Sequence, residues 1–259
     1  MSLKIKFTFK IITLTFLFLC VSISKTLSQN HTYQGHSHND YKRNIPFHDA
    51  FDAGILSFEI DVIYKKGELY ISHLPINPFT KKKFKEIYLV ESILNKIENL
   101  PNDMEVIFLI DVKNKPKKCL ESLRLLFSQK EDLFVNTCTK NSGRIKLIIT
   151  GKKPLKNLSE NDLCFLFFDV NLLQKHERIH YDNIGMVSSS LKVIKSANKK
   201  TNLNSSKILS EKAKKLNVPF RIWGIPQDKE AWKKLITNGV NLLNVDDLKL
   251  FRKFQIENI

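Results

Sequence analysis

The chain is poor in the residues that mark fibrous, disordered or disulfide-stapled proteins. Its 259 residues include only 8 Gly, 8 Pro and 4 Cys, while 42% are hydrophobic and 26% are charged. So little Gly and Pro excludes collagen-like and low-complexity chains, and the hydrophobic share excludes a fully disordered one. A chain of this length can bury a large core without disulfides, either as two small domains or as one α/β barrel.

No apolar run is long enough to cross a bilayer comfortably. The longest such run, at residues 11–21, follows several lysines and precedes small polar residues. This order is typical of a secretory signal peptide over residues 1–28, and an uncleaved membrane anchor is the alternative. We therefore predict export to the periplasm, the cell surface or the medium, with one domain at residues 29–259.

The chain has many more basic than acidic residues, which gives it a formal net charge of +16. Removal of residues 1–28 takes away four of the 42 basic residues and none of the 26 acidic ones, which leaves +12. The excess lysines are scattered rather than gathered with aromatic residues, so we expect no nucleic-acid partner. A basic body suits an anionic small-molecule or lipid-derived substrate, and also peripheral contact with an anionic membrane. The oligomeric state stays open.

Three of the four cysteines lie outside the predicted signal peptide. Cys119 and Cys138 could close a modest loop in an oxidising compartment. The interpretation that we favour is that these two and Cys164 are buried, inert thiols. None lies in a CxxC motif or beside a histidine, so neither zinc nor a thiol nucleophile is indicated.

Short apolar segments alternate with amphipathic ones along the rest of the chain. Several segments, such as VIFLIDV, are apolar throughout, as expected of parallel strands covered on both faces. The alternation predicts a single (β/α)8 TIM barrel. The predicted strands are 32–35, 57–63, 106–112, 145–150, 164–169, 184–188, 220–225 and 242–244. The predicted helices are 46–53, 91–100, 117–128, 206–216 and 229–238, and residues 192–205 are expected to form an exposed loop.

Polar side chains gather where the first three predicted strands end, which is where such barrels build active sites. Glu59 and Asp61 are two residues apart on one strand, so their carboxylates point the same way and can share a hard cation. Asp111 could supply a third oxygen, and the metal would be one Mg²⁺ or Ca²⁺. Lys113 follows two residues later and brings a positive charge to an anionic substrate.

The same strand ends carry histidines. His36 and His38 close the first strand, and His73 follows a hairpin-like continuation of the second. Histidines beside a cation site suit phosphoryl chemistry, in which one imidazole removes a proton and another protonates the leaving oxygen. The histidines at 31, 48, 176 and 180 are not accompanied by candidate metal-binding carboxylates, and we expect them on the surface.

Arg221 and Trp223 alternate on the seventh predicted strand. An arginine beside an indole can hold a phosphate and stack on a substrate. The alternatives are that Trp223 is a core residue and that Arg221 pairs with Asp246 to brace the last two strands.

The motifs GHSHNDY, DAFDAGILSFEIDV, LYISH, IDVKN, FRIWGIP and GVNLLNVDDL together resemble the PLC-like phosphodiesterase superfamily. This superfamily includes glycerophosphodiester phosphodiesterases and phosphatidylinositol phospholipases C, and the HSHNDY form is most similar to the altered-inheritance-of-mitochondria type. The resemblance implies acid/base roles for two histidines, a metal-binding role for three carboxylates, and substrate contact by three further residues. These are, in that order, His36 and His73; Glu59, Asp61 and Asp111; and Asn39, Lys113 and Trp223.

The sequence also departs from the glycerophosphodiesterase pattern. Ser37 and His38 follow His36 where that pattern has Arg and Gly, and Leu74 follows His73 where Asp is usual. The first departure leaves open whether His38 assists or replaces His36. Both leave the substrate open between glycerophosphodiesters and phospholipid head groups.

We therefore predict an exported, metal-dependent phosphodiesterase that uses histidine acid/base catalysis. The rival from another class is a catalytically silent protein that binds phospholipid head groups or acidic glycans. Loss of a metal carboxylate would favour this rival, and all three carboxylates are present in the sequence.

Overall fold

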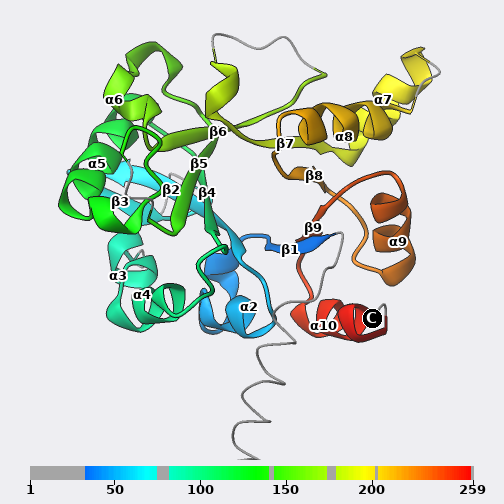
Figure 1. Ribbon diagram of the computed structural model, residues 1–259, viewed down its shortest axis with the longest axis horizontal. Helices are drawn as coiled ribbons and strands as arrows, with labels where there is room; N and C mark the ends of the chain where they lie inside the picture. Colours follow the sequence, from blue (N-terminus) through cyan, green and yellow to red (C-terminus); the bar gives the residue numbers. More distant parts are fainter. Residues whose placement is uncertain (1–32, 75–81, 140–142, 174–178, 202–203, 258–259) are drawn as a thin grey trace, which may run out of the picture.

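The computed structural model describes residues 33–74, 82–139, 143–173, 179–201 and 204–257. Eight parallel strands pair in chain order and close into a barrel, because β1 pairs with both β9 and β2 (Figure 1). The predicted (β/α)8 barrel is confirmed, and all eight predicted strands form, with ends shifted by a few residues. They are β1 (Gln34–Ser37), β2 (Ser57–Lys65), β4 (Val106–Val112), β5 (Ile145–Gly151), β6 (Leu166–Val170), β7 (Ile184–Ser190), β8 (Phe220–Trp223) and β9 (Leu242–Val245).

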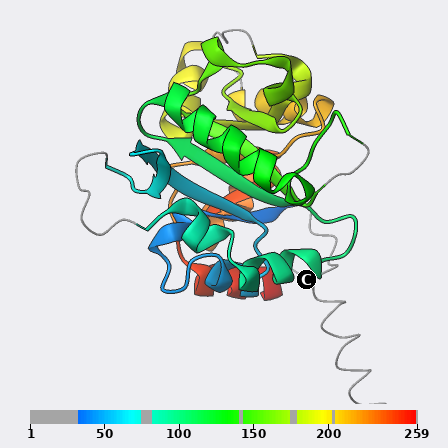
Figure 2. The ribbon, with the colours of Figure 1, turned by 90° about the vertical axis from the view of Figure 1, so that its left-hand side faces the viewer.

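Helices surround the strands, and a ninth strand, β3 (Glu68–Ile71), extends β2 as an antiparallel hairpin. Figure 2 shows α5 on the outside of the sheet. The helices are α2 (His48–Asp52), α3 (Phe84–Tyr88), α4 (Glu91–Glu98), α5 (Pro116–Gln129), α6 (Glu160–Leu163), α7 (Leu191–Thr201), α8 (Ser205–Lys215), α9 (Lys229–Thr237) and α10 (Leu248–Glu257). Short 3₁₀ turns are η1 (Asp40–Lys42), η2 (Glu131–Leu133), η3 (Leu155–Asn157) and η4 (Tyr181–Asn183).

The prediction of a loop at 192–205 was wrong. Most of this segment is helix α7, which buries Ile194 and leaves its lysines in solvent. Lysine is a good helix former, so a lysine-rich stretch with one buried apolar position is compatible with a surface helix.

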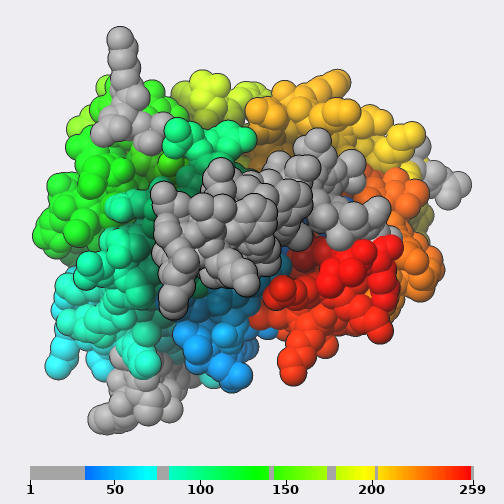
Figure 3. Space-filling view, turned by 60° about the horizontal axis from the view of Figure 1, so that its bottom comes forward, coloured from blue at the N-terminus to red at the C-terminus, as the bar shows by residue number. Residues whose placement is uncertain are grey.

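The first and last parts of the chain complete the outer ring together. Helix α10 lies beside the α2 segment, as Figures 1 and 3 show. Arg252 on α10 donates to the backbone oxygen of Asp52 on α2 at 3.3 Å. Gly35 on β1 has no room for a Cβ, which would come within 2.7 Å of Ile55 and Phe251. This close approach lets α10 and the segment that follows α2 pack directly against β1.

The inside of the barrel is filled by an apolar plug. Its side chains form a cluster separate from the larger core between strands and helices. The members of this interior plug are Leu109, Val135, Ile148, Phe167, Met186 and Leu242. Side chains alternate along a strand, so the next inward residue lies two positions further on. Those residues are polar on every strand concerned: Asp111, Thr150, Asp169, Ser188 and Asn244. The plug therefore supports a polar layer at the carboxyl ends of the strands, which we call the mouth.

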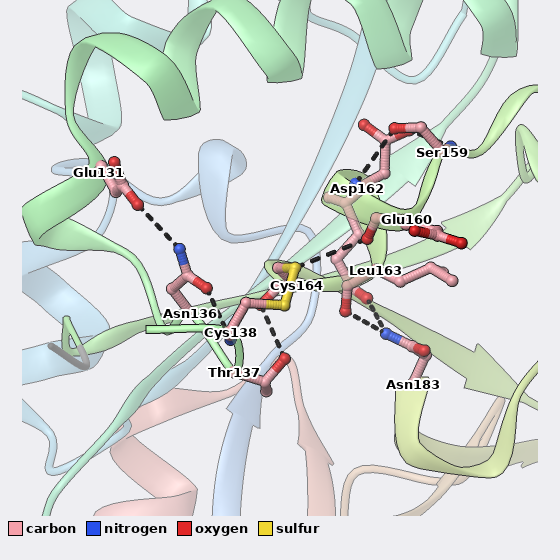
Figure 4. The surroundings of a disulfide bond; sticks show 11 residues. Glu131, Asn136, Thr137, Cys138, Ser159, Glu160, Asp162, Leu163, Cys164 and Asn183 are labelled. Carbon is pink, nitrogen blue, oxygen red and sulfur yellow. Dashed lines mark hydrogen bonds between the residues drawn. A yellow bond between two sulfur atoms is a disulfide. The ribbon is translucent and has the colours of Figure 1, made fainter. Parts of the chain in front are cut away.

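A disulfide lies at the opposite end of the barrel from the mouth. Cys138 and Cys164 precede β5 and β6 and are joined across a sequence separation of 26 (Figure 4). The Thr137 backbone N–H donates to the Cys164 backbone oxygen at 2.7 Å beside it. The suggested pair of Cys119 and Cys138 is therefore wrong, and so is the expectation that all three thiols are free. Only Cys119 fits that expectation among the described residues, as a buried thiol whose pKa burial raises to about 12.

The predicted signal peptide, residues 1–28, lies outside the described residues. Among the described helices, none is both long and apolar enough to cross a membrane. Gly54 and Gly239 follow α2 and α9 with φ values of 78° and 83°, the left-handed conformation that favours glycine just after a helix.

Candidate active site at the barrel mouth

The three predicted metal-binding carboxylates converge at the mouth. Glu59 and Asp61 come from β2, and Asp111 comes from β4, where it is paired in register with Asp61. One oxygen from each lies within 4.8 Å of the other two. Glu59 and Asp61 are buried, and buried carboxylates this close together are costly without a cation. Oxygen donors in this arrangement fit a hard divalent cation such as Mg²⁺ or Ca²⁺.

Lys113 binds two of these three carboxylates, those of Asp61 and Asp111. Its Nζ lies 2.6 Å from Asp111 Oδ2 and 3.1 Å from Asp61 Oδ1. Burial alone would lower the pKa of Lys113, but its hydrogen bond to Asp111 and the nearby negative charges raise it. Burial raises the pKa of Asp111 despite the lysine. The lysine is therefore a fixed positive charge at the carboxylate cluster.

Arg221 crosses from β8 to the inner carboxylate. Its Nη1 donates to Glu59 Oε2 at 2.7 Å and to His36 Nε2 at 2.6 Å. Burial would raise the pKa of Glu59, but the positive charge of the Arg221 guanidinium outweighs it and lowers that pKa. The suggested brace between Arg221 and Asp246 is not formed, because Asp246 binds a histidine instead. Arg221 belongs to the candidate site.

His36 is completely buried and held in one tautomer. Its Nε2 lies 2.6 Å from Arg221 Nη1 and 3.3 Å from Glu59 Oε2, and its Nδ1 lies 2.7 Å from Ser57 Oγ. With Nε2 accepting from Arg221, the proton is on Nδ1 and is donated to Ser57. Burial, assisted by the charge of Arg221, lowers the pKa of His36 to about 4. The imidazole is therefore neutral near pH 7, with its Nε2 lone pair directed at the cluster of Glu59 and Arg221.

His38 lies nearer the solvent and has the opposite electrostatics. Its Nδ1 lies 2.6 Å from Asp246 Oδ1, and its Nε2 lies 2.9 Å from Asn39 Nδ2. The hydrogen bond to Asp246 raises the pKa of His38, and the same bond lowers the pKa of Asp246. Two histidines of one short motif thus have pKa values that are shifted in opposite directions.

His73 reaches the site from beyond β3. Its Nδ1 lies 2.6 Å from Asp61 Oδ2, while 58% of its side chain is exposed. With Nδ1–H donating to the carboxylate, Nε2 is left to face outward. Asp61 thus links an exposed histidine to the carboxylate cluster.

The other two residues that were predicted to contact the substrate, Asn39 and Trp223, lie at the edge of the mouth. Asn39 has a left-handed backbone, with φ 48°, and accepts from the Tyr41 hydroxyl at 3.0 Å. Trp223 ends β8 with 47% of its surface exposed, so it is not a core residue. Away from the mouth, His180 is exposed and His48 is half-buried, whereas the other two expected surface histidines lie outside the described residues.

Three residues of the site were missed by reasoning from the sequence. The Tyr41 hydroxyl donates to Asp61 Oδ2 at 2.8 Å, and its own pKa is raised by burial and by Asp61. Ser57 binds His36, and Asn244 lies beside His36 on β9 with a buried Oδ1 that has no hydrogen-bond partner among the described residues. Ser57 could have been found from its spacing of two residues before Glu59.

Comparisons with known proteins agree with this architecture. The structure is similar to a glycerophosphodiester phosphodiesterase from Parabacteroides distasonis, with a TM-score of 0.57, 13% identity, and coverage of 89% of this chain and 100% of that one. It is also similar to the enzyme of that name from Agrobacterium tumefaciens, with a TM-score of 0.54, 11% identity, and coverage of 85% and 99%. The chain therefore has the TIM-barrel fold of glycerophosphodiester phosphodiesterases.

The sequence comparisons narrow this class. Residues 25–104 match the AIM6-like phosphodiesterase domain. The altered inheritance of mitochondria protein 6 homolog of Arthroderma benhamiae is 26% identical, covering 82% of this chain and 81% of that protein. The altered inheritance of mitochondria protein 6 of Eremothecium gossypii is 24% identical, covering 85% and 68%. The predicted resemblance to the PLC-like superfamily, in its altered-inheritance-of-mitochondria form, is confirmed, and the part of the chain that matches the AIM6-like domain is residues 25–104.

Proposed function

We propose that the protein is an exported, metal-dependent phosphodiesterase that hydrolyses glycerophosphodiesters or phospholipid head groups. The observation that carries this proposal is the convergence of three carboxylates within 4.8 Å, with a lysine and an arginine beside them. Negative oxygens that bind a cation, next to fixed positive charges, suit a phosphodiester anion. The rival function, that of a silent binding protein, has no comparable support, because none of the metal carboxylates is lost.

The chain's own residues would bind and orient the phosphate. Glu59, Asp61 and Asp111 would hold one Mg²⁺ or Ca²⁺, which when bound neutralises charge on the phosphate oxygens. Lys113 and Arg221 lie at opposite sides of these carboxylates and would bind the remaining oxygens.

Two histidines would then move the protons. A phosphate oxygen that accepts from Arg221 would free the Nε2 lone pair of neutral His36, which can take a proton from water or from a substrate hydroxyl. His73, held through Nδ1 by Asp61, would donate from Nε2 to the departing alkoxide. His38 is the alternative donor, since Asp246 favours its protonated form.

The expected location rests on two features. The predicted signal peptide directs the chain out of the cell, and the disulfide between Cys138 and Cys164 is of a kind that persists in oxidising compartments. The formal charge of +12 that remains without residues 1–28 supports peripheral contact with an anionic membrane, where phospholipid head groups are found.

A hydrolysis panel tests the proposal. Purified full-length protein is assayed on glycerophosphodiesters, phospholipids and bis(4-nitrophenyl) phosphate, alongside the Asp111→Asn variant. The matched control is Asp182→Asn, an exposed aspartate on η4 at the other end of the barrel. We expect at least one substrate to be cleaved by the wild type and the control, with a loss of about 10²-fold or more in Asp111→Asn. Binding without turnover by all three proteins would favour the silent binding protein instead.

A further inference from the structure

The polar layer of the mouth continues beyond the charged cluster, on strands that the proposed mechanism does not use. Asp169 of β6 lies two residues after Phe167 of the interior plug, so it also points into the barrel. It is 6% exposed, close to the 7% of Glu59. Asp169 therefore occupies the mouth in the same way as the predicted metal-binding residues, but on the other side.

Within the described part of the chain, the hydrogen-bond partners of the Asp169 carboxylate are all hydroxyl groups. Ser188 Oγ lies 2.6 Å from both carboxylate oxygens, and Thr150 Oγ1 donates to Oδ2 at 3.0 Å. Among the described residues, no Lys, Arg or His nitrogen comes within 4.0 Å of it. A neutral Asn or Ser could brace β5 and β7 equally well, without the cost of burying a charge. The charge is therefore better explained by a ligand.

The position of Asp169 in the barrel indicates which part of a substrate it would meet. β6 is the fifth of the eight parallel strands, half-way round from β1, which carries His36. It is also two strands from β4, which carries Asp111, and two strands from β8, which carries Arg221. Asp169 therefore faces the charged cluster across the mouth, where an alcohol group of a phosphate bound at that cluster would extend.

We infer that Asp169, with Ser188 and Thr150, is a subsite for the alcohol portion of the phosphodiester, and that it selects alcohols bearing free hydroxyl groups. This inference rests on the proposed function for the position of the phosphate. A carboxylate accepts hydrogen bonds from neutral hydroxyl donors and disfavours any second anionic group. The flanking serine and threonine hydroxyls can both donate and accept, which matches the hydroxyls of a polyol.

Binding of two phosphate monoesters tests the subsite without turnover. sn-Glycerol 3-phosphate and propyl phosphate carry the same phosphate, but only the first has free hydroxyls. Calorimetric titration in millimolar Mg²⁺ compares the wild type with Asp169→Asn, which keeps the shape and removes the charge. We expect the wild type to bind glycerol phosphate about 10-fold or more tightly than propyl phosphate, because hydrogen bonds to charged groups are the strong ones. Asp169→Asn should lose this preference and bind propyl phosphate unchanged.

The matched control is Asp162→Asn, which also alters a buried aspartate, but one that pairs with Arg124 outside the mouth. It should keep the preference. Equal weakening of both ligands in Asp169→Asn would overturn the inference. Phosphoethanolamine is titrated as a third ligand, and an effect of Asp169→Asn confined to it would also overturn the inference, because the subsite would then be an ammonium site. If Asp169→Asn does not fold, the wild type alone still tests the inference, because equal affinities for the two monoesters would overturn it.

A separate readout distinguishes failure of the inference from failure of the proposed function. Bis(4-nitrophenyl) phosphate has no free hydroxyl, so its hydrolysis tests the phosphodiesterase activity alone. Hydrolysis by the wild type and by Asp169→Asn at equal rates, without any preference for glycerol phosphate, would leave the proposed function standing and remove the subsite. Absence of hydrolysis together with a preference that Asp169→Asn abolishes would do the reverse.

Discussion

The disulfide between Cys138 and Cys164 yields a prediction whose magnitude follows from the structure. It joins residues 26 apart, and closing a loop of that length removes chain entropy worth about 3.5 kcal/mol from the unfolded state. For a domain of this size, such a change lowers the melting temperature by about 7 to 14 °C. We therefore expect a shift of that order in the double variant Cys138→Ser, Cys164→Ser, and on reduction of the wild type.

The position of the bond predicts that activity is spared. The disulfide lies where β5 and β6 begin, whereas the candidate catalytic side chains lie at the carboxyl ends of the strands. The segment that it tethers also supplies Val135 to the interior plug. Breaking the disulfide should therefore first destabilise the end of the barrel opposite the mouth. Hydrolysis at 25 °C should change little, while thermal inactivation accelerates.

Thiol titration and melting curves together check the pairing. The full chain has 4 Cys, and because Cys138 and Cys164 are joined, reduction should raise the number of reactive thiols in the unfolded protein by two. Cys119→Ala is the matched control, since that thiol is free and buried; it should remove one thiol under both conditions. Four thiols without reductant, combined with a melting temperature that reduction leaves unchanged, would refute the reasoning.

Three further predictions concern individual residues. His36→Ala should reduce turnover by about 10²-fold or more while exposed His180→Ala has no effect, and full activity in His36→Ala with loss in His38→Ala would transfer the role to His38. Arg221→Lys keeps the charge but replaces the planar guanidinium, whose Nη1 contacts both Glu59 and His36, with a shorter side chain that ends in a point charge, so kcat/KM should fall about 10-fold; full activity with a lower melting temperature would make Arg221 purely structural. Arg124 and Ser159 lower the pKa of Asp162 against the effect of burial, so its contribution to stability is present above pH about 4 and is lost as pH falls further. The melting temperatures of the wild type and Asp162→Asn should accordingly differ at pH 7 and converge in acid, and a constant difference would contradict this.

The charged half of the site could be predicted because strand geometry fixes it. Glu59 and Asp61 are two residues apart, as are Asp111 and Lys113, and the period of a strand places each pair on one face. The partners of Arg221 and Asp246 could not be predicted in this way. Arg221 of β8 reaches across the barrel interior to β2, and Asp246 after β9 contacts His38 after β1, so both contacts depend on how closure of the barrel brings together strands that are far apart in the sequence.

The cysteine pairing and helix α7 were missed for different physical reasons. Cys138 can bond to Cys164 only because the segment near residue 135 packs against the end of the barrel opposite the mouth. No local pattern in the sequence predicts this packing. In the 192–205 segment, asparagines and lysines suggested a loop, but a single buried Ile194 is enough to anchor the helix to the barrel. Ser57 and Tyr41 lie within motifs already singled out, so their contacts with His36 and Asp61 add to the predicted site without displacing it.

The central claim is that a divalent cation held by Glu59, Asp61 and Asp111 is required for hydrolysis. The most direct measurement is the hydrolysis rate of a phosphodiester by full-length protein that has been treated with chelator and then titrated with Mg²⁺ or Ca²⁺. The rate should be lost on chelation and restored at millimolar cation, with a rise in melting temperature that Asp61→Asn abolishes. Hydrolysis that persists in excess chelator, together with a melting temperature that neither cation changes, would contradict the account.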